Sequence, residues 1–294
     1  MISNVLFTLN TKKTAVYSSV LECAALCQER GISVGFLEEE EEYIREHLPQ
    51  LLTQCAVIKR PAHGQVDVIF VFGGDGTMLH ALDAFVECDI PMLGINLGRM
   101  GFLLETEVSE LEQAIDNLIS GAYVIERRMM LKVEGFCDGT RIDAYATNDV
   151  AISRGLSQRM IALDAYVGET LVDHYIADGV VLASPTGSTG YSLSAGGPIV
   201  SPDVQCFILN PICPHTLTSR PIVLSSEACV RLKLNMNEMR EGVQLSLDGQ
   251  SVCTMSNYEE IRICRSRHDA MLIRFLKERN YFALLKGKLS QWTL

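Results

Sequence analysis

Hydrophobic and polar positions alternate in two different ways along this chain, and the change falls near residue 125. Before it, short apolar runs at residues 5–9, 33–37, 66–72 and 92–96 are separated by segments with a longer apolar period. The runs predict buried strands, and a period of three to four residues predicts amphipathic helices. Strands and helices that alternate at this spacing indicate a parallel sheet with helices on its faces.

The helical segments have recognisable ends. One apolar stripe begins at Val16, and two further helices are predicted over residues 77–87 and 108–120. Gly31 and Gly121 stand where a helix favours a left-handed residue after its last turn. Five consecutive glutamates, residues 38–42, predict a solvated loop or the start of a helix.

After about residue 123 the helical period gives way to short β-rich runs, punctuated by the hairpin signals Asp138-Gly139 and Asp248-Gly249. These runs are residues 130–136, 141–146, 160–167, 180–184, 229–234 and 243–247. Beyond His268 a helical pattern returns, through Leu276, Phe282, Leu285 and Leu289. We expect an α/β nucleotide-binding domain over 1–125, an all-β domain over 126–267, and a helical tail over 268–294 that packs on the first domain.

The composition narrows the function classes. The 294 residues carry 25 basic and 36 acidic side chains, a net charge of −11, which argues against a nucleic-acid partner or an anionic membrane surface. No apolar run approaches a membrane span, and the first residues lack the pattern of a signal peptide. The ten cysteines include no CxxC and no zinc-like cluster with histidine. We therefore expect a soluble, cytoplasmic protein with free, buried cysteines and no protein-bound metal.

The first motif with chemical meaning is Gly-Gly-Asp-Gly-Thr at residues 73–77, between a buried strand and a helix. The glycines Gly73, Gly74 and Gly76 leave backbone N–H groups open to a phosphate, and the helix N-terminus favours anions. A carboxylate at Asp75 is suited instead to accept a hydroxyl proton or hold a metal ion. The alternative is a turn in which Asp75 caps the helix.

Two further clusters are weaker signals. Glycines at 94, 98 and 101 follow a strand end, where α/β sheets usually bind ligands. In Thr147-Asn148-Asp149, an amide and a carboxylate enter an apolar strand and could grip ribose hydroxyls. An ordinary loop explains the first cluster equally well, and an Asx turn explains the second.

The most informative segment is PTGSTGYSLSAGGPIV at residues 185–200, which follows Asp178-Gly179. Its glycines and hydroxyl side chains exclude a core strand or helix and are typical of a stretch that wraps a polar ligand. Tyr191 could stack on an aromatic ring of that ligand. A long surface loop is the alternative.

Together with ICPHTLTSRP and LDGQ, these motifs in this order resemble the ATP-dependent NAD kinases over roughly residues 66–250, with weaker similarity in YFALLKGKLSQW. The resemblance implies a Rossmann-like N-terminal domain, an all-β C-terminal domain and a site in the cleft between them. It implies transfer of the γ-phosphate of ATP, with a divalent metal, Mg²⁺, carried by ATP, to the 2′-hydroxyl of the adenosine ribose of NAD. Relatives also imply a homodimer or homotetramer.

The resemblance also implies roles for individual residues. Asp75 would be the general base, and the phosphate loop would comprise Gly73, Gly74, Gly76 and Thr77. The residues that would bind NAD are Asp75, Gly76, His80, Asn148, Asp149, Arg159, Asp178, Thr189, Gly190, Tyr191, Ser192, Leu193, Ser194 and Gln250.

The chain departs from the family pattern at Ala183-Ser184 and Gly190, which conserve space, and at Ile176, where some relatives carry a basic residue. A lipid or sugar kinase that shares GGDGT would leave residues 185–200 unexplained. A non-catalytic dinucleotide sensor would have no need for Asp75.

Overall fold

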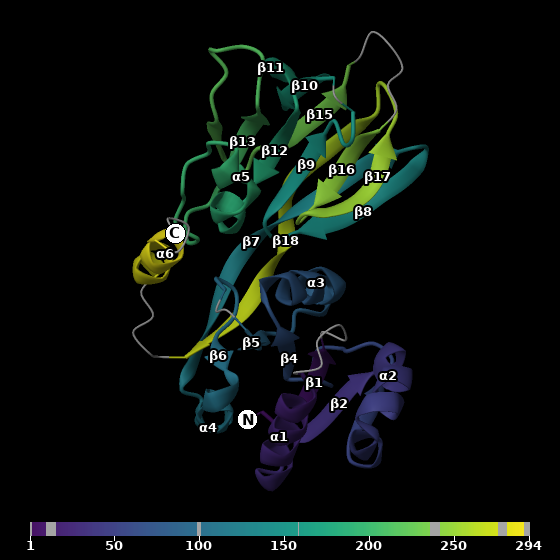
Figure 1. Cartoon of the computed structure of the whole chain (residues 1–294), viewed down its shortest axis with the longest axis vertical. Coiled ribbons are helices and arrows are strands. Elements are labelled where there is room, and N and C mark those ends of the chain that lie inside the picture. Colours follow the sequence, from purple (N-terminus) through teal and green to yellow (C-terminus); the bar gives the residue numbers. More distant parts are fainter. Residues whose placement is uncertain are drawn as a thin grey trace. The chain divides into compact units, whose positions relative to one another are not determined.

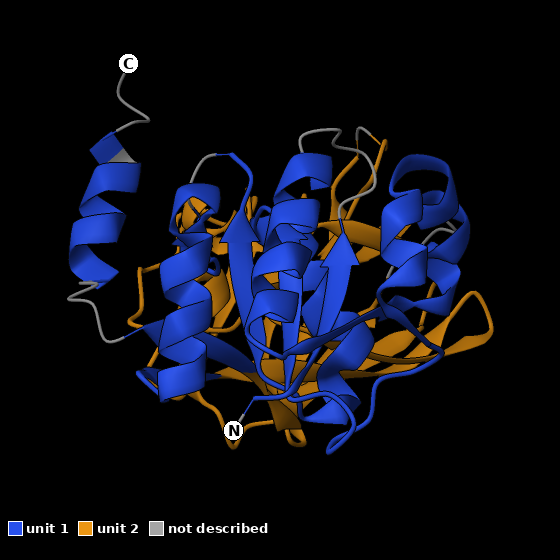
Figure 2. Cartoon of the chain, turned by 90° about the horizontal axis from the view of Figure 1, so that it is seen from below, with its two compact units in different colours: residues 1–127, 271–294 blue, residues 128–270 orange. Residues whose placement is uncertain are grey.

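The computed structural model describes residues 2–9, 16–98, 101–157, 159–235, 242–275 and 281–290. The chain forms two compact units (Figure 2). Unit 1 comprises Met1–Arg127 and Met271–Leu294, and unit 2 comprises Arg128–Ala270. Unit 2 is thus inserted in sequence between two segments of unit 1.

Unit 1 is built on a parallel sheet with the order β3-β2-β1-β4-β5 (Figure 1). These strands are β1 (Asn4–Leu9), β2 (Ser33–Leu37), β3 (Ala56–Ile58), β4 (Val68–Gly73) and β5 (Met92–Asn96). Beyond β5, the short β6 (Thr106–Glu107) and Leu272 of β18 (Glu260–Phe275) pair in parallel with it. Every residue of β4 is buried, as expected of a strand covered on both faces.

Helices follow these strands along the chain, and the last helix comes after β18. They are α1 (Val16–Glu29), α2 (Glu41–His47), α3 (Asp75–Phe85), α4 (Leu111–Ser120) and α6 (Tyr281–Ser290), with 3₁₀ turns η1 (Glu38–Glu40), η2 (Pro49–Thr53), η3 (Val86–Cys88) and η4 (Val108–Glu110). The apolar stripes of α1 and α4 share one core with Phe7, Phe70 and Leu93 of the sheet. Gly31 and Gly121 end their helices with φ angles of 72° and 75°, which confirms the predicted stops.

Unit 2 consists of antiparallel strands in two sheets. One has the order β14 (Ile222–Ser225), β13 (Cys206–Ile212), β12 (Gly179–Ala183), β9 (Asp149–Ser153), β16 (Val243–Leu247), β17 (Gln250–Met255). The other joins β11 (Thr170–Ala177), β10 (Ile161–Val167), β15 (Val230–Leu234) and β18, with β7 (Tyr123–Cys137) and β8 (Thr140–Ala146) paired alongside. Side chains from both sheets, such as Leu163, Leu182 and Phe207, bury one another in a single core.

Both predicted Asp-Gly hairpins are present. Asp138 and Asp248 have φ angles of 49°, and the glycines that follow have φ angles of 71° and 77°. Two consecutive left-handed residues are what the tight turn of a twisted hairpin requires. The fold class predicted from sequence, an α/β unit plus an all-β unit, is confirmed.

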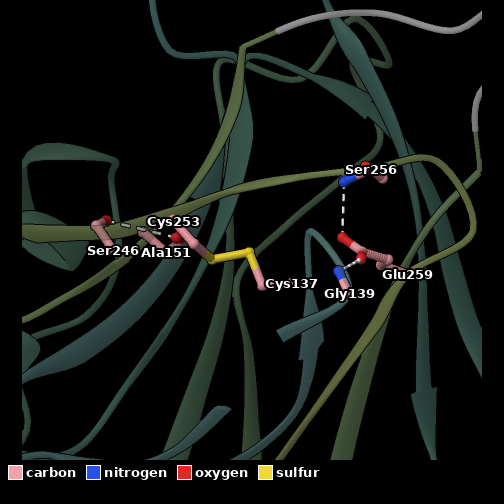
Figure 3. The surroundings of a disulfide bond; sticks show 7 residues. All are labelled: Cys137, Gly139, Ala151, Ser246, Cys253, Ser256 and Glu259. Atoms are coloured by element: carbon pink, nitrogen blue, oxygen red, sulfur yellow. Dashed lines mark hydrogen bonds between the residues drawn. A yellow bond between two sulfur atoms is a disulfide. The ribbon is translucent and has the colours of Figure 1, made fainter. Parts of the chain in front are cut away.

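The prediction that all cysteines are free is wrong for four of them. Cys137 of β7 is bonded to Cys253 of β17, which ties the two sheets of unit 2 together (Figure 3). Cys229 is bonded to Cys264, and their Cα atoms lie 4.4 Å apart on neighbouring strands. The pairs are 116 and 35 residues apart in sequence, so no local spacing motif marks them.

Two further predictions need correction. The tail is not helical from residue 268, because residues 268–275 complete β18; α6 begins only at Tyr281, and Leu276 lies outside the described residues. The glutamate run begins a helix, which was one of its two predicted alternatives, but Glu40 within it is 8% exposed rather than solvated. Its carboxylate accepts the N–H of Leu9 at 3.0 Å and that of Leu37 at 3.3 Å, and burial raises its pKa to about 7.

Candidate functional site

The Gly-Gly-Asp motif lies at the carboxyl end of β4, where the chain turns into α3. Gly74 is the cap of this helix and Asp75 its first residue, so the alternative that Asp75 is the N-cap is wrong. Gly73 admits no side chain, because a Cβ there would lie 2.2 Å from Thr77 Oγ1. The same hydroxyl accepts the N–H of Gly74 at 3.4 Å. Gly76 and His80 are exposed on α3.

The Asp75 carboxylate is held by the backbone of a neighbouring loop. Its Oδ2 accepts the N–H of Phe102 at 2.8 Å, and its Oδ1 accepts the N–H of Leu103 at 3.1 Å. A Cβ on Gly101 would lie 1.8 Å from the same carboxylate, so glycine is required for this approach. Gly101 of the second glycine cluster therefore makes room for the Asp75 carboxylate, and the N–H groups of the next two residues fix its orientation. We call this arrangement the seat of Asp75.

In unit 2, residues 147–149 are organised by a side chain from the β16–β17 turn. Asp248 Oδ1 accepts the N–H groups of Asn148 and Asp149 at 2.7 and 3.0 Å, and its Oδ2 accepts that of Thr147 at 2.9 Å. The Asp248 N–H donates to the carbonyl of Asp149 at 2.9 Å. Charge-assisted bonds of this kind are about twice as strong as neutral ones. Three consecutive amides are thus fixed by one carboxylate.

The opposite side of this loop is bound by Ser184. Its N–H donates to the carbonyl of Asn148 at 2.8 Å, and its hydroxyl donates to that of Thr147 at 2.5 Å. The same hydroxyl accepts the N–H of Gly187 at 3.2 Å. A Cβ on Gly187 would lie 2.1 Å from the Asn148 carbonyl, so the 185–190 turn and the 147–149 loop pack backbone to backbone. The departure at Ser184 therefore has a clear structural role.

Asp149 has an unusual environment for a carboxylate. It is 4% exposed, and burial, followed by repulsion from Asp248, raises its pKa to about 7. Tyr191 is 43% exposed, and its pKa is raised by burial and then by Asp149, Cys213 and Asp178. At neutral pH the Asp149 carboxyl is close to half protonated and can therefore donate as well as accept a hydrogen bond.

The run at 185–200 is less loop-like than its composition suggests. It contains the 3₁₀ turn η5 (Thr186–Thr189) and the one-turn helix α5 (Tyr191–Ser194). Ser192 is fully buried, and its carbonyl accepts a hydrogen bond from Asn210 at 2.9 Å. Thr189, Gly190 and Leu193 are half-buried, whereas Ser194 is exposed like Tyr191. The prediction that this segment contains no helix is therefore wrong.

The other predicted residues of unit 2 lie on turns. Asp178 precedes β12 and forms an ion pair with Arg154 at 2.8 Å. Arg159 is exposed, and its N–H donates to Ser157 Oγ at 3.3 Å. Gln250 is exposed at the end of the Asp248 turn. The structure thus brings Asn148, Asp149, Gly190 and Tyr191 together, and none of the contacts described above links Arg159 to that group.

Sequence reasoning missed several supporting residues. Asp248 was noticed only as a hairpin signal and as part of the LDGQ motif, and Ser184 only as a departure from the family pattern. Arg154 carried no signal, because it belongs to no motif and pairs with a residue that is distant in the chain. Among the described residues no group of three or more His, Cys, Asp or Glu is arranged to hold a metal. None of the described helices is long and apolar enough to cross a membrane.

A parallel sheet with a glycine-rich turn and a helix N-terminus at its carboxyl edge is typical of α/β proteins that bind nucleotides. Residues 7–123 match the ATP-NAD kinase N-terminal domain, and residues 147–275 match the ATP-NAD kinase C-terminal domain. The chain belongs to the ATP-NAD kinase family, whose members phosphorylate NAD to NADP with ATP.

Relatives and solved structures agree with this assignment. The NAD kinase of Moorella thermoacetica is 39% identical over 284 residues, which covers 96% of this chain and 82% of the relative. The NAD kinase of Heliobacterium modesticaldum is 39% identical over 285 residues, covering 96% and 97%. A yeast NADH kinase in complex with NADH superposes with a TM-score of 0.83 at 27% identity, covering 98% of this chain and 88% of that one. An Archaeoglobus fulgidus NAD kinase in complex with ATP gives 0.71 at 27%, covering 99% of each chain.

Proposed function

We propose that this chain transfers the γ-phosphate of ATP to the 2′-hydroxyl of the adenosine ribose of NAD, with Asp75 as the general base. The observation that carries the proposal is the seat of Asp75, whose carboxylate is oriented by two backbone N–H donors and a glycine. Asp75 takes the hydroxyl proton while the 2′-oxygen attacks the γ-phosphorus, and ADP leaves with the bridging oxygen.

The phosphates of ATP are bound by backbone rather than by lysine or arginine side chains. Gly73, Gly74, Gly76 and Thr77 present the N-terminus of α3, an eleven-residue helix whose first N–H groups and dipole favour an anion. We expect Mg²⁺ to be carried by the triphosphate, whose charge it would partly neutralise.

Most of the residues that we assign to NAD lie in unit 2. Asn148 and Asp149 hold the ribose of the nicotinamide half, and a carboxyl with a pKa of about 7 suits a hydroxyl that both donates and accepts. Asp178 lies near the nicotinamide amide, and residues 189–194 with Tyr191 surround the adenine end. Arg159, Gln250, Gly76 and His80 complete the set.

We further propose a cytoplasmic homodimer or homotetramer. The two disulfides mean that the cysteines no longer argue for a reducing compartment. Light scattering of the purified protein tests the oligomeric state, and fractionation of the source cells tests the location.

The reaction is tested by incubating the protein with ATP, Mg²⁺ and NAD and detecting NADP with an NADP-specific dehydrogenase. We expect steady NADP formation, and at least a ~100-fold lower kcat in Asp75→Asn with NAD binding intact. A variant that keeps a tenth of the turnover would exclude the base role. NAD binding without any NADP would favour a dinucleotide sensor.

A further inference from the structure

The loop whose N–H groups bind Asp75 is hydrogen-bonded through its carbonyl groups to one guanidinium, that of Arg274 near the end of β18. Its Nη2 donates to the carbonyl of Phe102 at 3.1 Å. Its Nη1 lies within hydrogen-bond distance of the carbonyls of Leu103 and Leu104, at 3.2 and 3.1 Å. Arg274 therefore binds three consecutive carbonyls of the loop whose N–H groups bind Asp75, and all these residues belong to unit 1.

One peptide group joins the two charges directly. The peptide between Phe102 and Leu103 accepts from Arg274 through its carbonyl and donates to Asp75 through its N–H, at 3.1 Å on each side. A hydrogen bond at the carbonyl of a peptide polarises its N–H, so the two bonds strengthen one another. The plane of this peptide cannot rotate without breaking both bonds.

Arg274 is in turn fixed by two carboxylates. Glu105, whose side chain is 1% exposed, accepts from Nη1 at 3.2 Å and from the N–H of Phe275 at 3.0 Å. Glu126 accepts from Nε at 2.6 Å. The planar fork of a guanidinium is suited to serve several acceptors in fixed directions, which a lysine cannot reproduce.

We propose that Arg274 is a positioning residue for Asp75, acting through the Phe102–Leu103 peptide. This inference rests on the proposed role of Asp75 as the base. Arg274 need not touch either substrate, so its loss disturbs the orientation of the carboxylate rather than the affinity for NAD or ATP. A base displaced by about 1 Å from the reacting hydroxyl lowers the rate by one to two orders of magnitude.

The first test is Arg274→Lys, which keeps one positive charge and loses the fork. We expect kcat to fall about 10-fold while the KM values for NAD and ATP stay within about twofold. Arg30→Lys is the matched control, because Arg30 also joins two carboxylates, Glu112 at 3.0 Å and Asp116 at 2.7 Å, with a side chain of similar exposure. We expect its kcat to be unchanged, since it supports only the α1–α4 contact.

The second test is a double-mutant cycle with Asp75→Asn, in which turnover is followed by transfer of radiolabelled phosphate from ATP. If Arg274 acts through Asp75, the combined variant is no slower than Asp75→Asn alone. Losses that multiply in full would overturn the positioning role and leave the base role intact. If Asp75→Asn by itself keeps a tenth of the turnover, the base role of Asp75 fails instead, and with it the premise of this inference.

A milder variant covers the case in which Arg274→Lys does not fold. Glu126→Gln weakens only the half-exposed partner of Nε, and we expect it to fold and to lower kcat about threefold at unchanged KM. Wild-type kcat in this variant, or in folded Arg274→Lys, would contradict the inference.

Discussion

The two units fix their predicted site residues by the same kind of hydrogen bond, between a carboxylate and backbone N–H groups, but with the roles of the two partners exchanged. In unit 1 the functional group is a carboxylate, and a loop donates two N–H groups to it. In unit 2 the functional groups sit on the loop, and the carboxylate of Asp248 accepts three N–H groups from its backbone. Unit 2 also carries two disulfides, whereas Cys23, Cys27, Cys55 and Cys88 of unit 1 are free.

This difference fits the roles that we propose for the two parts. A base that accepts a proton needs one carboxylate in one orientation, and a single rigid peptide can provide it. A loop that binds a ribose has to present two neighbouring side chains, so its backbone must be fixed on both sides. Asp248 and Ser184 provide the two sides.

The largest effect, on the stability of unit 2, is expected from removing a disulfide that unit 1 has no counterpart for among its described residues. Cys137→Ser/Cys253→Ser opens a loop of 116 residues, and its closure by the disulfide is worth about 5 kcal/mol in the chain-entropy model. We expect the calorimetric transition of unit 2 to move to markedly lower temperature and that of unit 1 to stay. Dithiothreitol should have the same effect on the wild-type protein.

Cys55→Ser is the control for this experiment, because it removes a half-buried free thiol from unit 1. We expect it to leave the unit 2 transition unchanged. An unaltered unit 2 transition in the double variant would show that non-covalent packing alone holds the two sheets of unit 2 together.

The next effect concerns the seat of Asp75. In Gly101→Ala the new methyl group would lie 1.8 Å from Asp75 Oδ1, so the carboxylate at the end of that side chain would be displaced. We expect kcat to fall about 100-fold, or about 2.7 kcal/mol in the barrier, with little change in the melting temperature. Gly287→Ala on α6, where a Cβ meets nothing within 4 Å, should keep wild-type kcat. A fully active Gly101→Ala would show that turnover does not require this orientation of the Asp75 carboxylate.

The smallest effect is expected from Asp248→Asn. The amide keeps the left-handed turn but replaces one acceptor oxygen with a donor that faces backbone N–H groups. We expect the KM for NAD to rise about 10-fold, about 1.4 kcal/mol, while kcat changes less than threefold. Asp138→Asn is matched in turn geometry, with the same φ of 49°, and should leave both constants unchanged. A lower kcat at constant KM would contradict the comparison above, in which unit 2 binds NAD and unit 1 supplies the base.

Local pattern predicted most of the architecture. The apolar runs correspond to β1, β2, β4 and β5, and both Asp-Gly turns form hairpins. These features depend on residues a few positions apart, which is the range over which periodicity and turn chemistry act. The strands β3, β6, β11, β13, β14, β17 and β18 were not predicted. β3 and β6 are only three and two residues long, and residues 268–275 of β18 were assigned to a helical tail.

The support of the site could not be predicted for the same reason. Asp248 binds amides 99 to 101 residues away, and Arg274 binds a carbonyl 171 residues away. Such pairs leave no mark on local composition, and neither do the cysteine pairs, which are 116 and 35 residues apart. Motifs identified the residues that carry the proposed chemistry, whereas the groups that hold them became visible only in the folded chain.

The order of the chain has a consequence for synthesis. Because unit 2 is inserted into unit 1, a ribosome synthesises Asp75 before unit 2 and Arg274 after it. A nascent chain that already carries the motifs between residues 66 and 250 still lacks the guanidinium for the Phe102–Leu103 peptide. Unit 1 can therefore complete its sheet only after all of unit 2 has left the exit tunnel, and a message truncated before residue 271 would encode the motifs without a finished active centre.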